Sequence, residues 1–172
     1  KHWASLDRFY TLNNGFLGIK SWSGTMFEYF MPHIFLPVYE CSADEEMLKF
    51  ALDRQQKFVP YGVPWGISES AYYAFDRDLN YQYKAFGVRD LSVNGGVERK
   101  EDCVVSPYSS FLTLPLANGS DVKKNLDIFS SIGAKGEYGY YDAVDYPSFS
   151  ANRMESVVMN SMVHHLGMSF LA

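Results

Sequence analysis

The stretch that most constrains the fold is Val63–Tyr73, with the sequence VPWGISESAYY. Pro64 and Gly66 interrupt a regular helix there, because proline removes a backbone donor and glycine favours turns. The stretch therefore predicts an irregular turn that carries one carboxylate, Glu69, among aromatic side chains. Such a carboxylate has two explanations. It caps the helix that follows, or it is a partly desolvated general acid beside aromatic rings.

Aromatic residues make up 17% of the 172 residues and include 13 tyrosines. Each buried tyrosine hydroxyl needs a partner, so tyrosines that line a polar cleft are one explanation for this number. Aromatic faces also suit stacking on the C–H faces of pyranose sugars. The net charge of −5 disfavours nucleic acid, an anionic membrane surface and a strongly acidic substrate. A neutral polyol substrate is compatible with it.

The length favours one domain with a sizeable core. Cys41 and Cys103 lie far apart and give no disulfide framework, which suits a reducing compartment. No apolar run approaches the roughly 20 residues of a transmembrane helix, and no signal peptide is evident. Neither end carries a start or stop signal, so we expect residues 1–172 to be an excised piece of a longer protein.

Helical patterns dominate the chain, joined by long aromatic loops. The expected helices run from about Thr25 towards Tyr39 with a kink at Pro32, from Asp44 to about Val59, from Ser106-Pro107 to about Leu116, from Ser120 to Gly133, and from about Met154 to the end. No alternating series of strands is evident. Helices of this kind pack pairwise into bundles or toroids, so we predict an all-α fold.

Four further acids stand in unusual settings: Glu28, Asp102, Asp142 and Asp145. Glu28 is the only charge in a long apolar run, so it is either a paired structural acid or a functional one. Asp142 and Asp145 lie close together among tyrosines, which suits turn and capping duty or a shared pocket. Glycoside chemistry needs two carboxylates, one to protonate the leaving oxygen and one as nucleophile or base.

His164 and His165 raise the question of a metal site. Neighbouring residues of a helix point to different faces, and H-x-x-x-H and C-x-x-C spacings are absent, so we expect no metal and no cofactor. A histidine that hydrogen-bonds a sugar is the better explanation. The sequence also lacks G-x-S-x-G, a phosphate-binding loop and G-x-G-x-x-G, so esterase, kinase and dinucleotide-binding functions have no support.

Four segments resemble the glucoamylase-like domain of cyclic β-1,2-glucan synthases: SWSGTMFEY at 21–29, VPWGISESAY at 63–72, NYQYKAFGV at 80–88 and HHLGMS at 164–169. The resemblance implies an (α/α)-barrel of glycoside-hydrolase type. We expect a partial barrel here, because fewer helices are evident than a closed barrel needs. It also implies action on β-1,2-glucan. In such synthases this domain is thought to close the linear glucan into a ring by transglycosylation, beside other domains, on the cytoplasmic side of the inner membrane.

The resemblance further implies roles for single residues. Glu69 is expected to be the general acid/base. Asp142 is expected to be the second carboxylate, in a stretch similar to the family's Tyr-(Glu/Asp)-Ala segment. Its shorter side chain counts against a nucleophile, and Glu28 is the rival. The expected substrate-binding residues are Glu28, Trp65, Tyr72, Tyr83, Asp145 and His164.

Three alternatives stay open at this point. The chain could be a glucan-binding scaffold without catalysis, or an endo-β-1,2-glucanase that transfers to water. A helical toroid with unrelated zinc chemistry would require bound metal in the purified protein.

Overall fold

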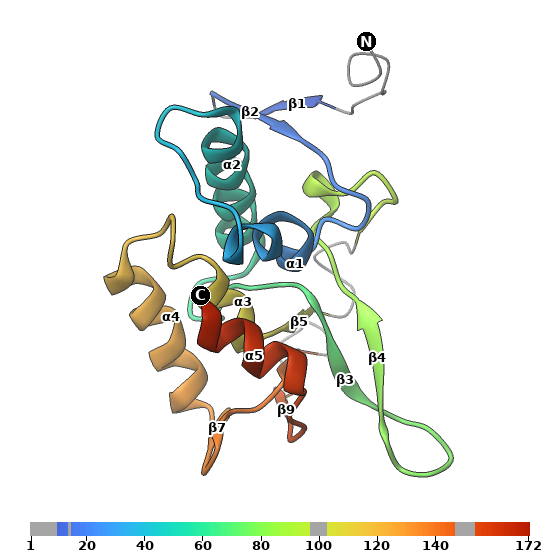
Figure 1. The fold of residues 1–172 in the computed structure, drawn as a ribbon. Coiled ribbons are helices and arrows are strands. Elements are labelled where there is room, and N and C mark those ends of the chain that lie inside the picture. Colours follow the sequence, from blue (N-terminus) through green and yellow to red (C-terminus); the bar gives the residue numbers. More distant parts are fainter. Residues whose placement is uncertain (1–9, 14, 97–102, 147–153) are drawn as a thin grey trace.

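The computed structural model describes residues 10–13, 15–96, 103–146 and 154–172. These residues form a mixed α/β structure with helices at one side, a long hairpin at the other and a small sheet between them (Figure 1). The prediction of an all-α fold, whether a whole or a partial (α/α) barrel, is therefore wrong.

The long hairpin consists of β3, Glu69–Phe75, and β4, Tyr81–Ala85, paired antiparallel with Ala71 opposite Tyr83. Asp76 closes its turn, because the carboxylate accepts the N–H groups of Asp78 and Asn80, both at 2.9 Å. Periodicity did not reveal this hairpin because Tyr72 and Tyr73 are adjacent in β3 and break its alternation, while β4 alternates over only five residues.

A three-stranded antiparallel sheet has the order β5-β8-β9, with β5 at Cys103–Val105, β8 at Ala143–Tyr146 and β9 at Ser156–Val158. Strands of three or four residues are too short for a periodic signal to emerge. Its last strand occupies the start of the helix expected from Met154. The helix itself, α5, begins later and covers Val163–Leu171.

Two short hairpins complete the strands. They are β1–β2, Tyr10–Asn13 with Phe16–Ile19, and β6–β7, Lys135–Gly136 with Gly139–Tyr140. The second hairpin explains why the glycine-punctuated stretch before Asp142 is not helical.

The remaining helices lie where helical patterns predicted them, but α1 and α3 are shorter than expected. They are α1 Met26–Phe30 with the 3-10 turn η2 Met31–Ile34, α2 Ala43–Phe58, α3 Pro107–Leu112 and α4 Gly119–Ser131. The 3-10 turn η3, Arg89–Leu91, was not predicted. Two of these helices begin slightly before the expected residue. Ser42 caps α2, whose expected start was Asp44, and Asn118 caps α4, whose expected start was Ser120.

Two buried amides hold the irregular segment around Pro64 and Gly66. The Gln55 side chain accepts the Ile67 N–H at 2.8 Å and donates to the Ile67 carbonyl at 3.0 Å. The Asn125 side chain accepts the Trp65 N–H at 3.0 Å and donates to the Trp65 carbonyl at 2.9 Å. Buried backbone groups outside helices and strands need such partners. The amides therefore replace secondary structure and fix the point where β3 begins.

A buried cluster joins the helices to both sheets, with Phe30, Phe50, Phe86 and Phe129 among its largest side chains. Within the described part of the chain, no helix is both long and apolar enough to cross a membrane.

We predict that Asn125→Ala lowers the free energy of unfolding by about 3 kcal/mol, because two backbone groups of Trp65 lose their partner in the interior. Urea denaturation measures this. The matched control is Asn94→Ala at an exposed position, with an expected change within about 0.5 kcal/mol. Equal effects of the two substitutions would contradict the bridging role of Asn125.

Candidate active site

Glu69 is the first residue of β3, and its side chain is half-buried. The backbone is held on both sides of it. The Tyr108 hydroxyl donates to the Glu69 carbonyl at 3.1 Å and shares a hydrogen bond of 2.8 Å with the Ser68 hydroxyl. The Ala71 N–H donates to Oδ2 of Asp142 at 2.7 Å. Elements far apart in the sequence thus set the direction of the Glu69 side chain.

The surroundings of Glu69 favour the protonated form of its carboxyl. Burial raises its pKa above the ordinary value, the negative charge of Glu28 raises it further, and His165 opposes these effects. A carboxyl of raised pKa retains its proton closer to neutral pH, which is what a general acid requires.

Asp142 precedes β8 and forms a buried pair with His165 of α5. Its Oδ1 lies 2.5 Å from Nδ1 of His165, and its side chain has no exposed surface. The His165 ring stacks on Tyr108 with centroids 3.9 Å apart and planes 12° apart. Nε2 of His165 is buried without a hydrogen-bond partner among the described residues. The pair connects β8, α5 and α3 directly behind β3.

His165 is the functional candidate that the sequence did not single out. We predicted His164, which is exposed, whereas His165 is the buried residue of α5. Two adjacent histidines carry no signal of which one faces inward. The short length of α5 leaves the helical phase undetermined without the structure.

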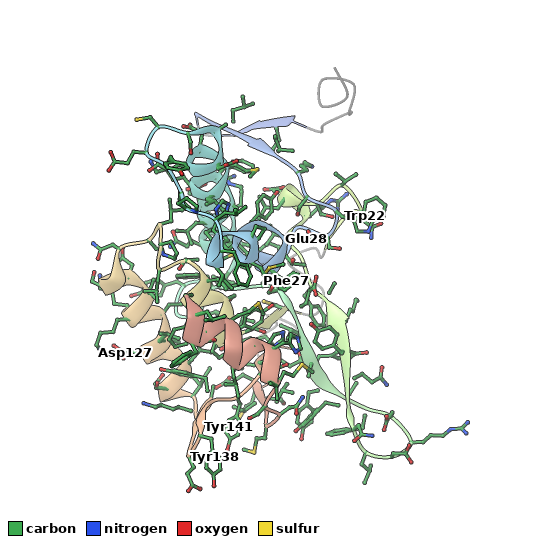
Figure 2. The ribbon with its side chains drawn as sticks, in the orientation of Figure 1. Trp22, Phe27, Glu28, Asp127, Tyr138 and Tyr141 are labelled. Carbon is green, nitrogen blue, oxygen red and sulfur yellow. The ribbon has the colours of Figure 1, made fainter. Side chains whose placement is uncertain are left out.

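A cavity of about 230 Å³ lies where α3, α5 and the β6–β7 hairpin meet. Asp142, His165 and Tyr108 line it together with Tyr140 and Tyr141, and Tyr141 is visible beside β7 in Figure 2. Glu69 does not line this cavity. This cavity therefore takes in Asp142 without Glu69.

Tyr83 of β4 connects the two sides of the site. Its ring centroid lies 6.2 Å from that of His165 and 6.5 Å from that of His164. Burial, and then the charges of Glu69 and Asp142, raise the pKa of its phenol to about 12. Tyr83 is thus within electrostatic reach of both carboxylates, and it stays protonated as a hydrogen-bond donor.

Glu28 lies in α1, and its carboxylate organises the preceding loop (Figure 2). It accepts the Ser21 hydroxyl at 2.5 Å, the Ser23 N–H at 3.0 Å and the Gly24 N–H at 2.9 Å. The Thr25 side chain accepts the Glu28 N–H in return, which completes a capping box. Glu28 therefore has a structural role, while its charge still reaches Glu69.

Three further predicted site residues make contacts that support the fold. Trp65 is 8% exposed and belongs to the core, so its indole offers little surface for a sugar. The Tyr72 hydroxyl donates to the Gln82 side chain at 2.7 Å, and the buried Asp145 accepts the Tyr73 N–H at 2.9 Å. Asp102 lies outside the described residues.

No metal-binding group of three histidine, cysteine, aspartate or glutamate side chains occurs among the residues that the structure describes. Cys41 is exposed and Cys103 is buried, and both are free thiols.

We predict that Glu69→Gln gains stability relative to the unchanged protein as the pH rises. A carboxyl whose pKa is raised by folding does not change the free energy of unfolding at a pH where it is protonated in both the folded and the unfolded protein. It lowers that free energy as the pH climbs from the ordinary glutamate pKa through the raised one, and glutamine avoids this loss. Chemical denaturation at a series of pH values measures the difference.

Glu137→Gln, at an exposed position, is the matched control and should show a smaller pH-dependent difference. A difference for Glu69→Gln that is constant across the acidic range would contradict the raised pKa.

Comparison with known proteins identifies the family. The family model described as putative glucoamylase matches residues 1–172. The cyclic beta-(1,2)-glucan synthase NdvB of Rhizobium meliloti (strain 1021) is 34% identical over 175 residues, which cover 100% of this chain and 6% of that synthase. The chain thus corresponds to a small part of a much longer relative, and the predicted resemblance is confirmed. The protein belongs to the putative glucoamylase family.

Proposed function

We propose that this domain rearranges β-1,2-glucan by transglycosylation, the step that closes a linear glucan into a ring. Family membership supports a carbohydrate-related role. The observation that carries the finer proposal is Glu69. Its carboxyl is half-buried, has a raised pKa and stands on a rigidly held strand beside the phenol of Tyr83.

In this proposal Glu69 acts first as acid and then as base. Its proton passes to the glycosidic oxygen while the bond from that oxygen to the anomeric carbon breaks. The resulting carboxylate then takes a proton from the incoming acceptor hydroxyl. Transfer exceeds hydrolysis when the site holds a sugar hydroxyl in place better than it holds water.

Asp142 is the proposed second carboxylate: it bonds to the anomeric carbon as the leaving oxygen departs, and it is released when the acceptor oxygen attacks that carbon. If Asp142 instead activates the acceptor, it takes the acceptor's proton itself, the acceptor oxygen attacks the anomeric carbon directly, and Glu69 serves as the acid alone. Both of its oxygens are engaged, by the Ala71 N–H and by His165. The Asp142 side chain also has no exposed surface, so a direct attack requires a neighbouring group such as His165 to move aside. Glu28 is the competing candidate, because it is less enclosed and its charge already acts on Glu69.

A glucan-binding scaffold is the second candidate function, and a specific observation favours it. Asp142 is fully enclosed and lines a cavity that Glu69 does not share. In that case the domain would hold glucan for other active sites of the protein. A hydrolase would use the same residues as the transglycosylase and differ only in the acceptor.

The relative's length suggests the setting of the domain. Because the chain corresponds to 6% of a cyclic beta-(1,2)-glucan synthase, we propose that it works beside other domains of a large protein. We place that protein at the inner membrane, with this domain on the cytoplasmic side.

We predict that Glu69→Gln lowers turnover of linear β-1,2-glucan at least about 100-fold, because the amide cannot donate a proton to the leaving oxygen. Mass spectrometry of the products of the intact protein carrying residues 1–172 measures turnover, ring formation and length redistribution. Glucan affinity should be retained, and Glu137→Gln, at an exposed position, should react normally. Unchanged turnover by Glu69→Gln would remove Glu69 from the mechanism.

A second pair of variants identifies the other carboxylate. We predict that Asp142→Asn abolishes turnover while Glu28→Gln leaves a measurable rate, in the same assay and with circular dichroism to check folding. The reverse pattern would assign the role to Glu28. Absent turnover by the unchanged protein, with glucan still bound, would favour the scaffold.

A further inference from the structure

The β3–β4 hairpin extends away from the body of the molecule (Figure 1) and carries exposed aromatic rings along its length. The exposed fractions are 51% for Tyr73, 42% for Phe75 and 44% for Tyr83. Contiguous exposed apolar surface of this kind usually marks a binding site.

The rings form a continuous group. The centroid of Tyr81 lies 6.0 Å from that of Tyr73 and 4.8 Å from that of Phe75, and Tyr73 lies 5.4 Å from Phe75. Tyr83 follows Tyr81 along β4 towards the site. An aromatic surface therefore leads from the hairpin tip to the base of the hairpin.

Glu69 stands on the same face of the hairpin. Residues directly opposite each other in a sheet share a face, and so do residues two apart along a strand. Because Ala71 pairs with Tyr83, this face contains Glu69, Tyr83 and Tyr81. The pairing shifts between Tyr72 and Phe75, but the ring contacts keep Tyr73 and Phe75 beside Tyr81.

The charged side chain of β4 lies elsewhere. Lys84 pairs with Ser70 on the opposite face, and it approaches the Phe86 ring there, at 5.3 Å. Arg77 and Asp78 belong to the turn at the tip. Apart from Glu69, the aromatic face thus presents phenol and phenyl rings without formal charge, which matches a neutral polyol.

We propose that this aromatic face is a binding track for a glucan chain, running from Glu69 to the hairpin tip. The inference rests on the proposed function, because it assigns a binding surface to the part of the glucan chain that extends beyond the reacting bond. Phe75 lies six residue steps beyond Glu69 along β3, about 20 Å at the usual rise per residue. That length holds several sugar units. The track therefore gives long chains an advantage over short ones.

The test compares long and short linear β-1,2-glucans by calorimetry on the intact protein in the Glu69→Gln background, which prevents turnover. The combined Tyr73→Ala and Tyr81→Ala variant should weaken binding of the long glucan about tenfold, with less than a twofold change for a short oligosaccharide. Tyr138→Ala is the matched control, because Tyr138 is 86% exposed in the β6–β7 turn, away from the hairpin (Figure 2). It should bind both glucans normally.

The outcomes separate the two levels of the proposal. Long-glucan binding that is unchanged in the hairpin variant overturns the track and leaves the proposed function intact. An absence of any β-1,2-glucan binding by the unchanged hairpin overturns the proposed function. Surface labelling of the intact protein in the absence of glucan tests whether another part of the protein covers the hairpin. Protection of Tyr73 and Tyr81 from the label would show that it does, and this result also overturns the track. A variant with Tyr73→Phe and an unchanged Tyr81 keeps both rings and should bind the long glucan as tightly as the unchanged hairpin. Its comparison with the double alanine variant separates loss of the rings from misfolding.

Discussion

The hydrogen bond from the Ala71 N–H to the Asp142 carboxylate connects the strand that carries Glu69 to the rest of the molecule. A buried carboxylate is stable only with donors on its oxygens, and Ala71 and His165 supply them. His165 in turn stacks on Tyr108, whose hydroxyl donates to the Glu69 carbonyl. The position of Glu69 therefore depends on a closed circuit of contacts among β3, β8, α5 and α3. None of these elements is near another in the sequence.

The same circuit determines what the site can do. Glu69 lies at the base of the β3–β4 hairpin, on its aromatic face, whereas Asp142 is enclosed and lines a cavity that Glu69 does not line. The arrangement suits a single partly desolvated acid more clearly than a symmetric pair of carboxylates. Glu28 contributes in two ways, because it completes the capping box of α1 with Thr25 and its charge raises the pKa of Glu69. A structural acid is thus also an electrostatic component of the site.

Local sequence signals made part of the fold predictable. Pro64 and Gly66 correctly indicated a break in regular structure, and Pro107 correctly indicated the start of a helix. The strands of these two sheets were missed because β5, β8 and β9 are short and because two adjacent tyrosines break the alternation of β3. Trp65 and His165 depend on long-range contacts, with Asn125 and Asp142, that no local pattern encodes. The expected barrel failed for the same reason: helical segments were visible, and their strand partners were not.

A direct titration of the Glu69 carboxyl shows whether the fold holds it as a proton donor. Carbon-detected NMR of the isotope-labelled Glu69 carboxyl in the intact protein gives the midpoint of its titration. We expect a midpoint above the ordinary 4.5, because burial and Glu28 both disfavour the charged form. The midpoint should be lower in Glu28→Gln than in the unchanged protein. A midpoint at or below 4.5 that Glu28→Gln leaves unchanged would show that the fold does not hold Glu69 as a proton donor.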